Sequence, residues 1–187
     1  MRELIIVAGA NGSGKTTFAK DLVEENGCVF LNADEIEKEL TESGAQPSHL
    51  KAGRIFFQKM QELTERESDF ILESTLAGNY LVGVIRKLRT KAYRISIVYI
   101  FLESPAVCID RISVRVKKGG HFVPDEDVIR RFYRSKRNFW HVYRTLADEW
   151  QVFYNSDHGF REVAFGSAGA STVIDERLHQ LFQRDLL

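Results

Sequence analysis

The stretch LIIVAGANGSGKTTFAKDLV, residues 4–23, joins an apolar run to a glycine-rich loop and then to an amphipathic segment. A strand, a loop and a helix in this order are the context required of a phosphate-binding P-loop. The glycines allow the backbone to form a concave nest whose N–H groups face inward, and the helix adds the positive end of its dipole. The stretch therefore predicts a binding site for a nucleoside triphosphate.

The candidate phosphate-binding residues lie in this loop or directly after it. They are Gly9, Asn11, Gly12, Ser13, Gly14, Lys15, Thr16 and Thr17. Lys15 supplies a compact cation for the outer phosphates, and Thr16 supplies a hydroxyl for a magnesium ion. An ordinary glycine turn is the alternative, but this spacing arises by chance in roughly one per cent of chains of this length. We therefore expect ATP and Mg²⁺ as cofactors.

The composition is typical of a globular protein. The chain has 187 residues, of which 44% are apolar and 28% charged, so we expect a single domain over residues 1–187. Twenty-six Lys and Arg balance 26 Asp and Glu. A duplex-binding protein is more often basic, so the net charge argues against nucleic acid as a partner.

Three observations bear on the compartment. No apolar run approaches the length of a membrane span, and the N-terminus leads directly into a strand without a signal peptide. Cys28 and Cys108 lie in apolar runs without metal-ligand spacing, so we expect buried thiols. Free thiols fit a reducing compartment, and we therefore expect a cytoplasmic protein with no membrane partner.

Apolar strands alternate with amphipathic helices along the chain. The predicted strands are 4–8, 28–31, 70–72, 95–102 and 150–154. The predicted helices are 17–23, 36–40, 47–66, 80–90, 104–115, a segment that begins at Asp125 and a last helix that Asp175 caps. Residues 161–173 are compatible with a hairpin or a pair of loops. This alternation predicts an α/β P-loop NTPase fold of the nucleoside-kinase-like class, with a five-stranded parallel sheet, helices on both faces and a helical lid.

Polar side chains follow three of the predicted strands. Asp34 comes 19 residues after Lys15, Glu73 and Thr75 follow 70–72, and Asn155 follows 150–154. Residues just beyond the carboxyl ends of parallel strands meet the ligand in open α/β sheets. Asp34 is either the first-turn acid or N-cap of the next helix, or a carboxylate that accepts a proton from a substrate hydroxyl. Glu73 either belongs to a turn with a capping Ser or Thr, or its carboxylate meets a ligand, a metal shell or a hydroxyl, and we favour the second interpretation. We expect Asn155 to meet the nucleotide.

The segment of residues 111–135 has the anatomy of a mobile lid. A helix with Arg111 and Arg115 on one face is followed by a glycine-containing break and by a second helix. A basic stripe runs along that second helix and consists of Arg130, Arg134, Arg137, His141 and Arg144. We expect Arg137 and Arg144 to be solvated, whereas Arg130 and Arg134 lie nearest the break, where they could reach the site. His121 is either a plain loop histidine or a substrate ligand between cationic segments.

With these parts in place, the chain resembles the zeta-toxin-like branch of P-loop kinases, whose members include proteins labelled as ABC-type ATPases. The matching stretches are GANGSGKTTFAK (9–20), LNADEI (31–36), ESTLAG (73–78), DRISVRVKKGGHFVP (110–124) and FYNS (153–156). The resemblance spans nearly the whole chain. It implies transfer of a phosphoryl group from ATP to the 3′-hydroxyl of the amino sugar of a UDP-N-acetyl amino sugar. It also implies a small antitoxin protein as a partner.

The resemblance also implies roles for individual residues. Asp34 matches the general base. Glu73 and Thr75 match the substrate motif, although this chain has EST where the toxins have EGT. Arg111 and Arg115 match lid arginines that neutralise the transferred group, but the stretch around His121 lacks a further lid arginine.

The sequence thus predicts an ATP-dependent small-molecule kinase whose acceptor carries a hydroxyl group. The alternatives are a nucleoside or nucleic-acid-end kinase, and an ATP-binding, non-catalytic member that acts through a partner protein. An ABC-type motor is disfavoured, because the chain has neither an LSGGQ-like segment nor a Walker-B strand that ends in Asp-Glu.

Overall fold

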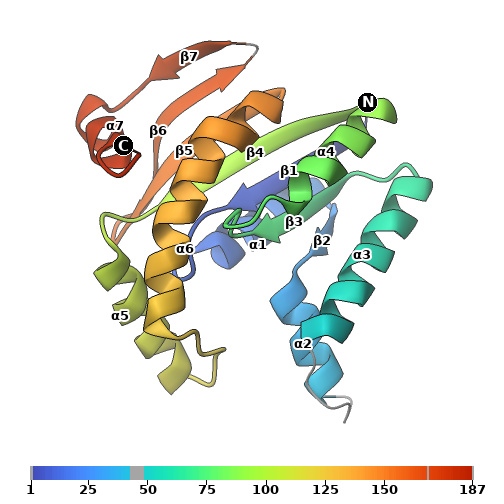
Figure 1. The fold of residues 1–187 in the computed structure, drawn as a ribbon, viewed down its shortest axis with the longest axis horizontal. Coiled ribbons are helices and arrows are strands. Elements are labelled where there is room, and N and C mark those ends of the chain that lie inside the picture. Colours follow the sequence, from blue (N-terminus) through green and yellow to red (C-terminus); the bar gives the residue numbers. More distant parts are fainter. Residues whose placement is uncertain (1, 43–48, 168, 187) are drawn as a thin grey trace.

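A computed structural model describes residues 2–42, 49–167 and 169–186 of the chain (Figure 1). The strands are β1 Arg2–Ala8, β2 Val29–Leu31, β3 Phe70–Ser74, β4 Tyr93–Phe101, β5 Glu149–Ser156, β6 Gly159–Ser167 and β7 Ala170–Val173. The α-helices are α1 Lys15–Asn26, α2 Ala33–Glu42, α3 His49–Glu65, α4 Tyr80–Thr90, α5 Pro105–Lys117, α6 Asp125–Asn138 and α7 Glu176–Gln183. A π-helix, η1 Phe139–Tyr143, and a 3₁₀ turn, η2 Arg144–Leu146, continue α6.

The sheet has seven strands in the order β2-β3-β1-β4-β5-β6-β7. The first five are parallel, whereas β6 and β7 are antiparallel additions. The prediction of a five-stranded parallel sheet is therefore wrong, although the α/β P-loop class is confirmed. The physical reason is that β5 without β6 would have unpaired backbone groups along its outer edge. The segment that the sequence left open between a hairpin and loops supplies the missing partner.

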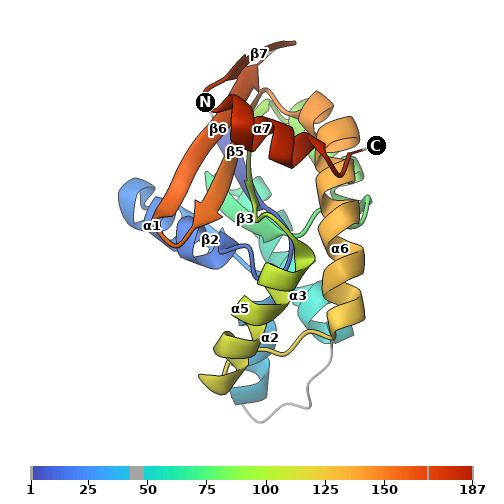
Figure 2. The same cartoon turned by 90° about the vertical axis from the view of Figure 1, so that its left-hand side faces the viewer.

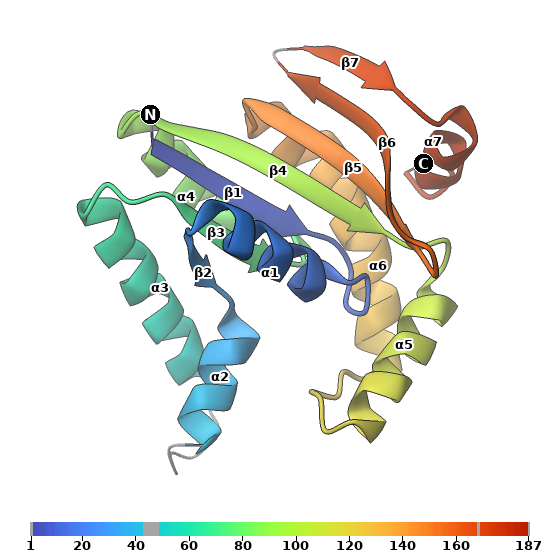
Figure 3. The same cartoon turned by 180° about the vertical axis from the view of Figure 1, so that it is seen from behind.

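Helices cover both faces of the sheet, as predicted (Figures 1 and 3). Along β1, Ile6 packs into the cluster beneath α4 and η1, whereas the next residue, Val7, packs with Ala19 of α1 on the opposite face. This alternation is the normal consequence of the two-residue period of a strand. The parallel core is thus buried on both sides, as its continuous apolar runs predict.

Helices α6 and α7 pack together on the face opposite α1. Figure 2 shows α7 beside the upper part of α6, and the rings of Phe139 and Phe182 lie 6.2 Å apart between centroids. Lys136 of α6 is buried and forms an ion pair of 2.7 Å with Asp185. As predicted, Asp175 caps α7, since its side chain accepts a hydrogen bond from the Leu178 amide.

Two pairs of helices project from the sheet around the loop after β1. Helices α2 and α3 form one pair, and α5 and α6 form the other (Figures 1 and 3). Ser104 caps α5 through the Val107 amide and Pro105 is its first residue, as the sequence indicates. Helix α3 begins at His49 in the described part of the chain, and the predicted start at Pro47 lies outside it. None of the described helices is both long enough and apolar enough to cross a membrane.

Candidate active site

The loop between β1 and α1 has the backbone shape that its glycines predict. Gly12 and Gly14 have φ angles of 83° and 94°, in the left-handed region that favours glycine. A Cβ atom on Gly12 would lie 2.6 Å from the Cys108 carbonyl oxygen, and one on Gly14 would lie 2.3 Å from Nδ2 of Asn155. The loop is therefore fixed by close contacts with α5 and β5 as well as by its own sequence.

Lys15 is buried at the start of α1. Its Nζ donates a hydrogen bond of 2.8 Å to the Ala10 carbonyl and lies 3.7 Å from Oε1 of Glu73. A lysine ammonium has three N–H donors, so this arrangement leaves donors for a ligand. The side chain lies folded over the loop, where phosphate oxygens would meet it.

Glu73, near the end of β3, joins three elements. Its Oε2 accepts hydrogen bonds from Oγ1 of Thr16 at 2.8 Å and from Nδ2 of Asn32 at 2.7 Å. The carboxylate is largely buried, and these donors together with Lys15 compensate its charge. The sequence-based assignment of site residues overlooked Asn32, although it directly follows β2 in the LNAD stretch that drew attention to Asp34.

Asp34 lies in the first turn of α2, where an acid is favourable to the helix dipole. It is not the N-cap, because Oδ1 of Asn32 accepts the bonds from the Asp34 and Glu35 amides. Asp34 also lines the cavity next to Lys15. Asp34 can therefore stabilise the start of α2 and also lie beside a bound ligand.

One cavity of about 160 Å³ brings ten of the predicted site residues together. They are Asn11, Gly12, Gly14, Lys15, Thr16, Thr17, Asp34, Glu73, Arg111 and Arg115, and Ile112 also lines the cavity. The remaining predicted residues do not line it; these are Gly9, Ser13, Thr75, His121, Arg130 and Asn155.

The two α5 arginines approach the cavity with different partners. An Nη of Arg111 donates to the Asn155 carbonyl at 3.4 Å and lies 3.6 Å from the exposed carboxylate of Asp157. An Nη of Arg115 donates to the His121 carbonyl at 2.7 Å, and its buried Nε has no partner within the described residues. Both guanidiniums thus keep donors that a phosphate group can use.

The arginine of α6 that reaches the loop is Arg131, which the sequence-based assignment did not select. One of its Nη atoms donates to Oδ1 of Asn11 at 3.3 Å. Arg130, which was expected near the site, is exposed and pairs with Asp127 at 2.6 Å. The basic stripe gave no signal for Arg131, because the rotation of α6 is set by the packing of Val128 and Phe132.

Three predicted ligand residues outside the cavity have contacts within the protein. Nδ2 of the buried Asn155 donates to the Ser13 carbonyl at 2.8 Å and so supports the loop from behind. Oγ1 of Thr75 accepts a bond of 3.4 Å from the Ala77 amide in the turn after β3. His121 is exposed, and only its backbone carbonyl contacts Arg115.

The donor set is chemically suited to a magnesium ion. The Thr16 hydroxyl and the Glu73 carboxylate both line the cavity, and Mg²⁺ prefers such oxygen ligands together with water and substrate phosphates. Neither cysteine lines this cavity. Cys108 is fully buried, burial raises its pKa to about 12, and Cys28 is only half-buried, contrary to the expectation of two buried thiols.

Residues 4–138 match the family described as AAA domain. An uncharacterized protein of Haemophilus influenzae is 28% identical over 132 residues, which cover 69% of this chain and 91% of the relative. A cytidylate kinase of Archaeoglobus fulgidus is 26% identical over 158 residues, which cover 80% of this chain and 81% of the relative.

Solved structures share the fold at lower identity. The structure of AvrRxo1-ORF1:-ORF2 with ATP matches all of this chain with a TM-score of 0.80 and 16% identity, and this chain spans 65% of that chain. A structure from the PezAT chromosomal toxin–antitoxin system of Streptococcus pneumoniae matches with a TM-score of 0.67 and 17% identity over 100% of this chain and 86% of that chain. The likeness to a protein of a toxin–antitoxin system is thus one of fold, since the family matched by sequence is described as AAA domain and not as zeta toxin.

Proposed function

We propose that this chain, which belongs to the AAA domain family, is an ATP-dependent kinase that transfers the γ-phosphate to a hydroxyl group of a small acceptor. The observation that carries the proposal is one cavity that Lys15, Thr16, Asp34, Glu73 and the α5 arginines line together. Phosphoryl transfer requires positioning and diffuse positive charge more than covalent chemistry. The cavity combines these requirements.

The donor half of the site consists of the loop and α5. The loop amides and Lys15 bind the phosphates of ATP, and Asn155 and Cys108 hold the loop in its binding shape. Thr16 and Glu73 would hold a magnesium ion, which when bound neutralises charge on the phosphates. Arg111 and Arg115 supply further N–H donors for the transferred group.

The acceptor half begins at Asp34. Its carboxylate accepts the proton of the acceptor hydroxyl as the oxygen attacks the γ-phosphorus and the bond to ADP breaks. We propose a UDP-N-acetyl amino sugar as the first acceptor to test, because the resemblance to zeta toxins points to it. A protein partner is proposed on the same ground, and the PezAT structure comes from a toxin–antitoxin system.

The proposal is tested by incubating the purified protein with ATP, magnesium and a panel of nucleotide sugars, nucleosides and oligonucleotides. Mass spectrometry then detects any phosphorylated acceptor. We expect Asp34→Ala to lower product formation about a hundredfold while ATP still binds, because it removes the general base and leaves the loop intact.

Glu35→Ala is the matched control. Glu35 lies in the same helical turn but pairs with Lys20 at 3.0 Å and does not line the cavity. Its activity should be close to that of the unmodified protein. The proposal is wrong if no acceptor is phosphorylated, or if Asp34→Ala and Glu35→Ala have the same activity.

A further inference from the structure

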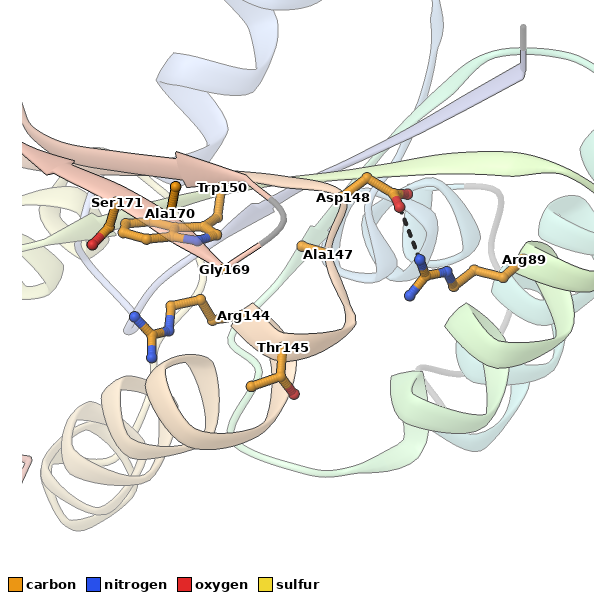
Figure 4. Close-up of a pocket in the computed structure, with 9 residues that line it drawn as sticks. All are labelled: Arg89, Arg144, Thr145, Ala147, Asp148, Trp150, Gly169, Ala170 and Ser171. Atoms are coloured by element: carbon orange, nitrogen blue, oxygen red, sulfur yellow. Dashed lines mark hydrogen bonds and ion pairs between the residues drawn. The ribbon is translucent and has the colours of Figure 1, made fainter.

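The proposed function leaves a larger cavity without a role. It has a volume of about 580 Å³ and lies between the end of α4, the turn η2 and the β6–β7 hairpin (Figure 4). Asp148, which lines it, precedes β5, whereas Asn155 near the end of β5 supports the P-loop. Seven residues of extended chain span about 23 Å, so the two cavities lie at opposite ends of the sheet. Its volume is within the usual range for small-molecule sites.

Arg144 is held in a fixed orientation at one side of this cavity. Its guanidinium carbon lies 3.8 Å from the centroid of the Trp140 ring and 5.5 Å from that of Trp150. Its Nε donates to the Trp140 carbonyl at 3.3 Å. The expectation of a solvated Arg144 is therefore wrong, because the π-helix η1 turns this residue toward the tryptophans.

The two terminal nitrogens of Arg144 are not used. Within the described chain, neither Nη atom donates a hydrogen bond and the guanidinium has no ion-pair partner. Stacking on a ring engages the face of a guanidinium and leaves the N–H groups in its plane available. Burial lowers the pKa of Arg144, but an arginine stays protonated at any physiological pH.

The second arginine of the cavity is already neutralised. Arg89 pairs with Asp148 at 2.9 Å and donates to the Leu146 carbonyl at 3.2 Å, as the dashed line in Figure 4 marks for the ion pair. The other carboxylate oxygen of Asp148 accepts a bond from the Ile95 amide. The cavity therefore has a net charge of +1, and that charge belongs to Arg144.

We propose that this cavity is a second ligand site, which binds the phosphate or carboxylate group of a small organic anion through the two Nη atoms of Arg144. A planar guanidinium with two parallel N–H groups matches an oxyanion in a bidentate manner. Figure 4 shows Ser171 of β7 on the same side of the cavity as Arg144, away from the Arg89–Asp148 pair, where its hydroxyl is a further donor. The tryptophan stack fixes the guanidinium before the ligand arrives, which lowers the entropy lost on binding.

The two tryptophans of the chain make the test direct, because both flank Arg144. Intrinsic fluorescence is recorded while inorganic phosphate or citrate is added to the Lys15→Ala variant, in which the P-loop is impaired. We expect a saturable change in emission with at least one of the two anions. The anion that causes the change shows whether the site binds phosphates, carboxylates or both.

Two substitutions test whether Arg144 and Ser171 contribute to anion binding. Arg144→Gln should weaken the responding anion at least about tenfold, since it removes the charge and the bidentate donors. Ser171→Asp should weaken it similarly without touching the tryptophans, which matters if Arg144→Gln impairs folding. The matched controls are Arg137→Gln, an exposed arginine of α6 outside the cavity, and Thr172→Asp, whose side chain is on the other face of β7.

The proposal is overturned if neither anion gives a saturable change. It is also overturned if Ser171→Asp binds the anion as tightly as Thr172→Asp does. A response in the unmodified protein that disappears in Lys15→Ala would assign the binding to the P-loop and would equally contradict a second site. None of these outcomes depends on kinase activity.

Discussion

Gly12 and Gly27 both have a positive φ but differ in what surrounds them. A Cβ on Gly12 would lie 2.6 Å from the Cys108 carbonyl oxygen, whereas one on Gly27 would have nothing within 4 Å among the described residues. Gly12→Ala should lower the free energy of unfolding by about 3 kcal/mol, from backbone strain and the clash together. Gly27→Ala should lower it by about 1 kcal/mol from strain alone.

Denaturant unfolding and nucleotide titration separate the two glycines. We expect Gly12→Ala to lose ATP binding and Gly27→Ala to keep it, since only Gly12 lines the cavity. Equal losses of stability in the two variants would show that the contact with Cys108 does not shape the loop.

Because Cys108 is buried, we expect the free energy of unfolding to fall in mild alkali. Burial raises the pKa of Cys108 from 9.0 to about 12, so above pH 9 the unfolded chain loses the thiol proton while the folded protein retains it. Stability from this group is complete below pH 9 and falls as the pH rises toward 12, by at most about 1.4 kcal/mol per pH unit. In thermal melts, Cys108→Ala should show a shallower decline between pH 9 and 10. Cys28→Ala, which retains Cys108, should keep most of the decline.

At the scale of residues, the sequence located the loop and the strand-end carboxylates but not every partner. Lys15, Thr16 and Glu73 meet because a P-loop and the end of β3 lie at the same edge of the sheet, which strand order alone implies. The choice between Arg130 and Arg131 depends on how α6 is rotated about its axis. That rotation results from side-chain packing between distant segments, and local periodicity does not contain it.

At the scale of elements, α6 and η1 hold the turn that follows Glu73. Nδ2 of Asn138 donates to the Leu76 carbonyl at 2.8 Å, and the Tyr143 hydroxyl donates to the Gly78 carbonyl at 2.6 Å. Leu76 has a φ of 53°, which is unfavourable for a leucine. A strained turn persists only when its surroundings determine its shape, so these two bonds hold the turn in its shape.

We expect this turn to border the acceptor, as the resemblance implies for Thr75, so Tyr143→Phe should raise the KM for the acceptor severalfold while the KM for ATP stays the same. The substitution removes one hydrogen bond to the turn and leaves the P-loop untouched. Steady-state kinetics with each substrate varied in turn would measure the split. Tyr133→Phe is the control, because Tyr133 is on α6, which η1 continues, is partly exposed and has no hydrogen bond from its hydroxyl within the described residues. An equal effect on both KM values would contradict a positioning role.

Helices and strands were predicted correctly where neighbouring residues in the sequence determine the structure. Ser104 and Pro105 begin α5, and residues 80–90 form α4, as capping and periodicity indicate. Prediction failed where distant pairing decides, as in the attachment of β6 to β5. The π-helix η1 was also missed, because one inserted residue in a helical turn leaves no mark on an apolar pattern as irregular as FWHVY.

At the scale of the whole molecule, the apolar core is divided. A small cluster formed by Ala10 of the loop, Leu102 and residues of α5, α6 and their connection is separate from the clusters on the two faces of the sheet. Small clusters with few buried contacts open at lower free energy than the main core. Because Ala10 belongs to the small cluster, we expect a ligand in the loop to stabilise α5 as well.

Hydrogen exchange followed by mass spectrometry tests this division. Without nucleotide, amides of α5 should exchange at least about tenfold faster than those of β1 and β4. An ATP analogue with magnesium should slow exchange in α5, and Lys15→Ala should remove that effect. If α5 is as protected as β4 before any nucleotide is added, residues 111–135 do not act as a lid.

The position of β1 has a consequence for how the protein is made. β1 is synthesised before the strands beside it in the sheet, since it pairs on one side with β3 and on the other with β4. The loop that follows it is shaped by Ile100, Cys108 and Asn155, which are synthesised much later. A nascent chain therefore contains the whole nucleotide motif long before it can bind nucleotide, and we expect the ability to bind to appear only after Asn155 has been translated.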